Sequence, residues 1–275
     1  MKNAIHMLKS VTDIQMNSFL IVTPSGKVIA IDGGHRQDAT YFLSYLREVT
    51  GKEIPHIDAW FLTHPHNDHV DAFLEIMEHH RQALTLDKVY FNFPSARFML
   101  LEPDRSAAQT VEDFTRSLPL FADKVAFCSG YDKIDVGEAH IDVLYSPDFV
   151  ITQNVCNNAS LVLRITLGGK TALFTGDCGV EAGQKILQLW ERTGMLKADI
   201  CQMAHHGQNG CDRTFYEAVS PQVCLWNTPL WLWNNDAGKG YNTHVWKTVA
   251  VREWMAQLGV KENLAIKDGT QVYRW

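Results

Sequence analysis

The chain has 275 residues, of which 46% are hydrophobic and 20% are charged, and this composition is typical of a globular protein with a sizeable core. Its 25 basic and 31 acidic residues give a formal charge of −6, which does not favour nucleic acid as a partner, although a local basic patch is compatible with it. Because no stretch approaches the ~18 consecutive apolar residues of a membrane span, we expect neither a membrane-spanning segment nor a membrane partner.

The first half of the chain alternates short apolar runs, which predict strands, with stretches of helical spacing. Pro24, Ser25 and Gly26 predict the turn of a hairpin between the first two strands. Asp38 is placed to be the N-cap of the helix that follows, and Gly51 lies just beyond its end. The predicted elements are strands at 17–23, 27–32, 57–63 and 88–92 and helices at 38–49, 71–82 and 106–115.

The second half of the chain repeats this style. Its predicted elements are strands at 141–145, 160–167, 171–175, 199–203, 222–226 and 271–275 and helices at 180–193 and 245–258. Strands lead and helices follow in both halves, which predicts an α/β protein with an αββα four-layer sandwich, two mixed sheets inside and helices outside. No linker or low-complexity tract interrupts the pattern, so residues 1–275 are expected to form one domain.

The strongest chemical signal is the segment 63–69, which directly follows an apolar strand. It carries His64, His66, Asp68 and His69, that is, three imidazoles and a carboxylate within six residues. Imidazole nitrogens and carboxylate oxygens suit zinc, and also manganese or iron. In a loop, the first two histidines can point one way and the last two residues another, which would serve two ions about 3.5–4 Å apart. Histidines collected by chance in a polar loop are a weak explanation for such density.

Two more polar segments follow apolar strands. Gly176 and Asp177 end the strand at 171–175, at a sheet edge where ligand sites collect, and this carboxylate could bridge two metal ions. His205 and His206, which precede Gly207, would suit one metal ligand and one imidazole beside the substrate. Taken alone, a capping aspartate and a surface histidine pair would explain these two segments equally well or better. Their shared placement at strand ends favours a common site.

With these three segments in this order, the sequence resembles the metallo-β-lactamase superfamily, whose HxHxDH signature is matched by His64, His66, Asp68 and His69. Within that superfamily it is similar to the ComEC-type branch, which includes hydrolase domains of competence proteins. The resemblance implies the metallo-β-lactamase fold. It runs along nearly the whole chain, through Val28–Gly34, Asn157–Leu163, Thr175–Asp177, His205–Gly207 and Tyr241–His244.

The resemblance also implies a set of ligands for two divalent ions, with zinc expected and manganese or iron as alternatives. The first metal site takes His64 and His66, the second takes Asp68, His69 and His205, and Asp177 bridges the two.

Most members of the superfamily have one more histidine for the first site, and the comparable stretch here, Val155–Ser160, has none. Cys156 and Asn157 are the candidates for that place. A thiolate is a good zinc ligand, but a lone buried cysteine is more often structural. The alternative is a weaker first site, or one filled by water.

Three residues beyond this ligand set are expected to assist. Asp32 would receive a hydrogen bond from a ligand histidine, unless it is only a turn residue before Gly33. His206 and His244 are candidate catalytic residues that would hold the substrate or protonate its leaving group. Asp68 would orient the nucleophile while it binds metal.

The resulting prediction is a binuclear metal-dependent hydrolase whose nucleophile is a metal-activated hydroxide. A small molecule or a phosphodiester is the expected substrate, and phosphodiester hydrolysis is favoured, because the members that the chain resembles act on phosphodiesters. The alternatives are a lactone or thioester hydrolase of the same fold and, in another class, a di-iron redox protein or a metal-binding protein without catalysis. Flavin-linked di-iron relatives carry a carboxylate where His66 stands here, which counts against that class.

Two segments have both an ordinary and a functional interpretation. Trp226, Trp231 and Trp233 would pack in the core or form an aromatic wall for a base, sugar or quaternary ammonium group. Arg97 and Arg105 would be solvated or would meet an anionic substrate.

The six cysteines form no CxxC pair and the N-terminus lacks an export signal, so we expect reduced thiols and a cytoplasmic protein. No pattern in the sequence sets an oligomeric state.

Overall fold

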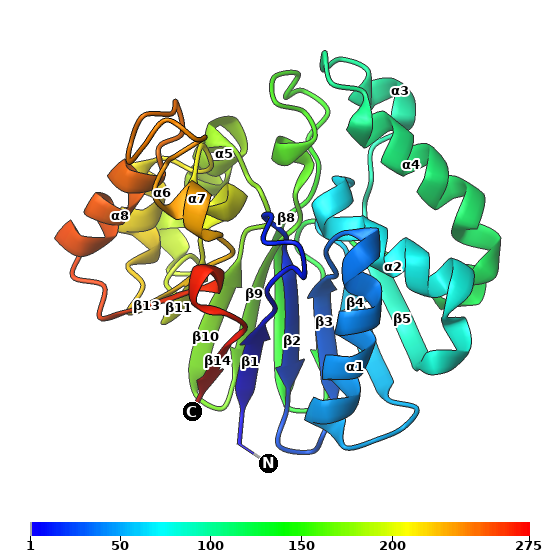
Figure 1. Cartoon of the computed structure of the whole chain (residues 1–275). Coiled ribbons are helices and arrows are strands. Elements are labelled where there is room, and N and C mark those ends of the chain that lie inside the picture. Colours follow the sequence, from blue (N-terminus) through cyan, green and yellow to red (C-terminus); the bar gives the residue numbers. More distant parts are fainter. Residues whose placement is uncertain (1) are drawn as a thin grey trace.

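Two mixed sheets of seven strands lie face to face in the computed structural model, which describes residues 2–275, and helices cover both outer faces (Figure 1). The two sheets are built alike, because in each sheet the strands toward one edge pair antiparallel and those toward the other edge pair parallel. This arrangement confirms the αββα sandwich predicted from the order of strands and helices.

Neighbouring strands in each sheet are also neighbours along the chain, except that the last strand joins the edge of the first sheet. The first sheet contains, in spatial order, β14 (Gln271–Arg274), β1 (Ala4–Met7), β2 (Ser18–Val22), β3 (Val28–Asp32), β4 (His56–Phe61), β5 (Thr85–Phe91) and β6 (Val125–Phe127). The second sheet contains β13 (Glu262–Ala265), β12 (Val223–Trp226), β11 (Ile200–Gln202), β10 (Lys170–Phe174), β9 (Val162–Leu167), β8 (Ala139–Tyr145) and β7 (Lys133–Val136).

The helices divide between the two outer faces. Those of the first half are α1 (Ala39–Thr50), α2 (Asn67–His79), α3 (Ala96–Met99) and α4 (Ser106–Ser117). Those of the second half are α5 (Val180–Trp190), α6 (Arg213–Val219), α7 (Leu230–Trp233) and α8 (Thr248–Gln257). Apolar residues of α1, α2 and α4 join a buried cluster with the first sheet, and those of α5, α6 and α8 join one with the second. None of the helices in residues 2–275 is long and apolar enough to cross a membrane.

Aromatic packing on the first sheet supports the end of β3. Trp60 is fully buried between Phe42 of α1, with ring centroids 4.8 Å apart, and Phe73 of α2, at 5.0 Å. Burying each such side chain contributes about 1.5–3 kcal/mol. The Trp60 Nε1–H also donates to the backbone oxygen of Asp32 at 3.0 Å. The core therefore holds Asp32, a residue at the functional end of the sheet.

The predicted hairpin is confirmed, because β2 and β3 pair antiparallel with Val22 opposite Val28. Gly26 in its turn has φ +81° and donates its N–H to Thr23. Gly51 ends α1 with φ +67°, as expected for a C-cap. Asp38 is the N-cap residue of α1 as predicted, but its carboxylate makes no capping hydrogen bond and accepts from Ser10, Val11 and the N–H of His35 instead.

Other differences from the predicted elements have local causes. Helix α2 begins at Asn67 rather than near residue 71, with His66 as an extended N-cap residue, so the last part of segment 63–69 is helical. The apolar spacing that predicted this helix begins only after its first turn. Strands β1, β6, β7 and β13 and helices α3, α6 and α7 were missed because they are short, with three to seven residues each. All six cysteines are buried and free.

Candidate metal centre

Four segments meet where parallel strands of the two sheets end. Strands β3 and β4 are parallel neighbours in the first sheet, as are β10 and β11 in the second. Asp32 ends β3, segment 63–69 follows β4, Asp177 follows β10, and His205 and His206 follow β11. Ligand sites in α/β proteins collect at such carboxyl ends.

Segment 63–69 holds its side chains on two kinds of backbone. His64 lies in a bend and His66 in the extended residue before α2, and the His64 Nε2 is 3.0 Å from the His66 Nδ1. Asp68 and His69 lie in the first helical turn. His64 and His69 are fully buried and Asp68 is nearly so, while His66 is half-buried. The change from extended chain to helix aims the two pairs differently.

Asp177 sits where the second sheet approaches segment 63–69. Gly176 before it has φ +52°, and a Cβ there would lie 2.8 Å from the Ser160 Oγ, so glycine suits both the conformation and the space. The Ser160 hydroxyl also accepts the Asp177 N–H at 3.0 Å. The Asp177 Oδ1 is 3.2 Å from the His69 Nε2, and its Oδ2 is 3.8 Å from the His64 Nε2. One carboxylate therefore faces two histidines with different oxygens.

The turn after β11 decides which of two adjacent histidines faces the cluster. His205, His206 and Gly207 have φ values of +52°, +55° and +75°, a left-handed conformation that is costly for non-glycine residues. A Cβ on Gly207 would lie 2.4 Å from the Trp226 ring, so the turn is packed tightly onto β12. His206 is buried, and its Nε2 is 3.0 Å from the Asp68 Oδ2.

His205 occupies a different position from His206. Its side chain is 21% exposed, compared with 2% for His206, and its Nε2 is 3.9 Å from the Asp177 Oδ2. The His206 Nε2 is closer to the same oxygen, at 3.4 Å. His206 therefore takes the place beside Asp68 and His69 that was predicted for His205.

The buried donor atoms fit a metal pair. One ligand atom from each of His64, His69 and Asp177 lies within 4.8 Å of the others, and the same holds for Asp68, His69 and His206. The His69 Nε2 faces the Asp177 Oδ1 at 3.2 Å and the His206 Nε2 faces the Asp68 Oδ2 at 3.0 Å, although no hydrogen bond of good geometry joins them. Each imidazole can present this nitrogen to a cation once it has lost its proton. The nitrogen and oxygen ligand atoms suit zinc, manganese or iron.

Asp32 orients one of these histidines, which confirms the contact expected for it. The His69 Nδ1–H donates to the Asp32 Oδ2 at 2.7 Å, which leaves Nε2 to face Asp177. Thr63 donates to both carboxylate oxygens, through its N–H and its hydroxyl, and Asn17 donates through its side-chain amide. Asp32 has φ +53°, a strained conformation for aspartate. Sequence reasoning gave no role to Thr63, although it begins segment 63–69, and it missed Asn17, for which no motif gave a signal.

The charges of the cluster balance within it. Burial by itself would raise the pKa values of Asp68 and Asp177, but the imidazoles of His69 and His206 hold both well below their usual range. Burial lowers the pKa of His206, yet Asp177 and Asp68 outweigh it and raise that pKa to about 9. Burial and then His69 lower the pKa of His64. Both carboxylates are thus ionised and ready to bind cations, which would displace the histidine protons.

The remaining predicted residues lie around this cluster or apart from it. The His244 ring lies against that of Trp246, tilted by 33° with ring centroids 3.7 Å apart, and no hydrogen bond, ion pair or ring contact within residues 2–275 joins it to the ligand cluster. Its catalytic role stays a prediction. Trp226 is buried, and the Trp233 ring packs against the Arg252 guanidinium 4.3 Å from its centroid. These two tryptophans follow the ordinary packing interpretation.

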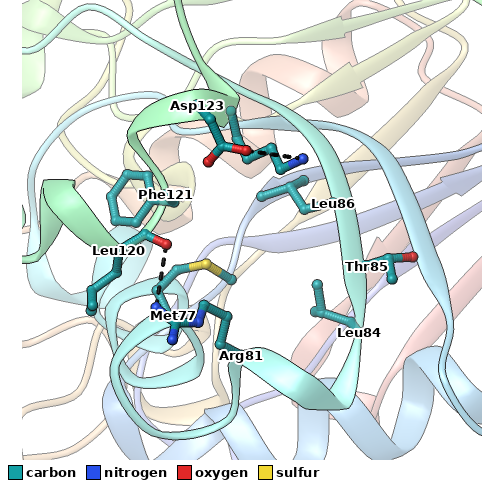
Figure 2. A pocket seen from close by; sticks show the side chains of 9 residues that line it. Met77, Arg81, Leu84, Thr85, Leu86, Leu120, Phe121 and Asp123 are labelled. Atoms are coloured by element: carbon teal, nitrogen blue, oxygen red, sulfur yellow. Dashed lines mark hydrogen bonds and ion pairs between the residues drawn. The ribbon is translucent and has the colours of Figure 1, made fainter.

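One well-formed pocket lies away from the cluster. Figure 2 shows this cavity, of about 220 Å³, which Met77, Arg81, Leu84, Thr85, Leu86, Leu120, Phe121, Asp123 and Lys124 line. Met77 is nine residues along α2 from Asp68, or roughly 14 Å at the rise of an α-helix. The pocket is therefore not part of the candidate metal centre.

Comparison with known proteins gives a consistent family. The sequence model of the "Metallo-beta-lactamase superfamily" matches residues 11–210. The ComE operon protein 3 of Bacillus subtilis is 26% identical over 179 residues, which cover 64% of this chain and 20% of that protein. The match thus spans about a fifth of that relative's length.

Solved structures share the fold at low sequence identity. The metallo-β-lactamase fold protein YhfI of Bacillus subtilis has a TM-score of 0.57 and 14% identity, over 98% of this chain and 99% of that one. CmlA, a diiron β-hydroxylase of Streptomyces venezuelae, has a TM-score of 0.58 and 14% identity, over 100% of this chain and 54% of that one.

Proposed function

Because the chain belongs to the metallo-β-lactamase superfamily, we propose that it is a hydrolase that acts with two divalent cations, zinc by preference, on a phosphodiester. The observation that carries the proposal is the convergence of the buried imidazole nitrogens of His69 and His206 on the carboxylates of Asp68 and Asp177. These atoms come from three separate segments and meet at the carboxyl ends of strands from both sheets.

The geometry supports a specific assignment of ligands. Asp68, His69 and His206 would hold one cation, since their ligand atoms lie together. His64 and His66 would hold the other, and Asp177 lies between the two groups, facing a histidine of each. His206 thereby replaces His205 as the proposed ligand.

When bound, two divalent cations supply Lewis-acid chemistry, which lowers the pKa of water from 15.7 toward about 7 and stabilises negative charge on substrate oxygens. The side chains around them would place the reactants. Asp68 would accept a hydrogen bond from the attacking water and orient it. His205 is the more exposed imidazole of the pair, and it would donate a hydrogen bond to the substrate or its leaving group.

A phosphodiester is the proposed substrate for two reasons. A pair of cations can hold both the attacking and the leaving oxygen of an in-line phosphoryl displacement. The similarity to ComE operon protein 3 also agrees with the ComEC-type resemblance of the motifs. Arg97 and Arg105 are exposed and form no ion pair within residues 2–275, so they are available to an anionic substrate.

The test combines metal content with a panel of substrates. We expect purified or reconstituted protein to carry about two zinc or manganese ions and to cleave bis-p-nitrophenyl phosphate only when loaded. Asp177→Ala should lose both metal and hydrolysis, whereas Asp135→Ala, at an exposed carboxylate of β7, should keep both. Protein that takes up no metal would end the proposal. Turnover of a lactone or thioester alone would refute the phosphodiester, and iron-dependent oxygen consumption without hydrolysis would favour a redox protein.

A further inference from the structure

Cys156 lies beside the two histidines that are short of a third protein ligand. The Cys156 Sγ and one ring nitrogen from each of His64 and His66 all lie within 4.8 Å of one another. Cys156 is fully buried. The Asp177 Oδ2 lies 3.8 Å from the His64 Nε2 and 3.9 Å from the His205 Nε2, so these two side chains also border this group.

The backbone around Cys156 is held in place independently of any metal. Its N–H donates to the Glu102 Oε1 at 3.0 Å, and its carbonyl oxygen accepts the Ala159 N–H at 3.1 Å. The Leu161 N–H donates to the Thr63 oxygen at 2.9 Å, which ties this loop to segment 63–69. Met99 and Val111 of the α3–α4 region pack with Cys156 in one apolar cluster. The Cys156 thiol is therefore held in this position before any metal binds.

The Cys156 thiol lies between an apolar cluster and two imidazoles. Among the other cysteines, the thiols of Cys178, Cys201 and Cys211 each donate to a backbone oxygen, at 3.6, 3.3 and 3.5 Å, whereas within residues 2–275 no such bond is found for Cys128, Cys224 or Cys156. What distinguishes Cys156 is the pair of imidazole nitrogens within 4.8 Å of its sulfur. Asn157, the other candidate for this place, donates its side-chain NH₂ to the Asn154 Oδ1 at 2.8 Å and leaves its own Oδ1 buried without a hydrogen bond. The choice of Cys156 therefore depends on its distances to His64 and His66.

We propose that Cys156 is a metal ligand, which completes a His64–His66–Cys156 site beside Asp177. Binding replaces the S–H bond with a sulfur–metal bond, and the proton leaves to solvent, so no oxidant or reductant is involved. A thiolate makes this site softer than the one formed by Asp68, His69 and His206, because sulfur favours zinc or cobalt over manganese. The inference rests on the proposed metal-dependent function and gives its two sites different chemistry.

Cobalt(II) tests this assignment without any measurement of hydrolysis. Metal-free protein titrated with cobalt should develop a sulfur-to-cobalt charge-transfer band in the near ultraviolet as the His64–His66–Cys156 site fills. Cys156→Ser should lose that band and lower the bound cobalt from about two equivalents toward one. Cys156→His should restore the second equivalent without the band. Cys128→Ser, at a buried cysteine outside the cluster, should match the wild type.

The outcomes separate this inference from the proposed function. Two bound cobalt ions without a sulfur band in the wild-type protein, or a band that persists in Cys156→Ser, would overturn the cysteine assignment and leave the metal centre standing. No cobalt binding at all would overturn both. Circular dichroism of each metal-free variant checks that it is folded, and Cys156→His gives a second measurement if Cys156→Ser does not fold.

Discussion

Substitution of Asp32 by asparagine would change one atom in the support of the proposed metal centre and nothing in its outline. The Asp32 Oδ1 accepts the Thr63 N–H, and its Oδ2 accepts from Thr63, Asn17 and His69, all at 2.7 Å. An amide would place an NH₂ group against at least one of these donors. The less costly orientation turns the NH₂ toward the Thr63 N–H alone, because the other oxygen has three donors.

The expected magnitude follows from those contacts. One buried donor left unpaired costs about 1–3 kcal/mol, and the remaining bonds lose the strength that the negative charge gave them. We therefore expect Asp32→Asn to lower the free energy of unfolding by about 2–4 kcal/mol. His69 would also lose the carboxylate that orients its Nδ1–H, and such losses lower metal affinity about 10- to 100-fold, or about 1.4–2.7 kcal/mol.

Asp38→Asn is the matched control. Asp38 is as buried as Asp32 and accepts from Ser10, Val11 and the N–H of His35, but it touches none of the proposed ligands. Zinc affinity is measured by competition with a chromophoric chelator, and stability by urea unfolding of the metal-free proteins. We expect both variants to lose stability and only Asp32→Asn to lose zinc affinity. Equal zinc affinity in Asp32→Asn and the wild type would refute the positioning role.

Two further predictions concern histidines. His206→Ala should lose about one metal equivalent and His205→Ala should keep two, because the His206 Nε2 lies 3.0 Å from the Asp68 Oδ2. Elemental analysis measures the metal content of both variants. The reverse pattern would restore His205 as the ligand. Burial and then Arg274 lower the pKa of His6 to about 4 from 6.5, so the unfolded chain takes up a proton first as the pH falls. The free energy of unfolding should therefore drop by up to about 3 kcal/mol between pH 6.5 and 4. His6→Gln should make this dependence of stability on pH less steep. An equal dependence in the variant and the wild type would contradict the assignment of the pH effect to His6.

Much of the fold and most of the proposed ligand set could be predicted from the sequence, because they depend on short-range patterns. Alternating apolar runs and helical spacing predicted the paired sheets and outer helices, and polar residues directly after buried strands marked the sheet edge. His64, His66, Asp68, His69 and Asp177 are all drawn together by that rule, since the carboxyl ends of parallel strands meet at one edge.

Tertiary structure alone decided the choice between neighbouring residues. His205 and His206 are equivalent in the sequence, but a left-handed turn pressed onto Trp226 aims the second one at Asp68. Cys156 and Asn157 were both candidates for the missing ligand from the sequence, and only the packing of their loop sets the Cys156 sulfur beside His64 and His66. Local periodicity reports which face of an element is buried. The direction of a side chain in a strained turn depends on contacts from distant segments, which no local pattern contains.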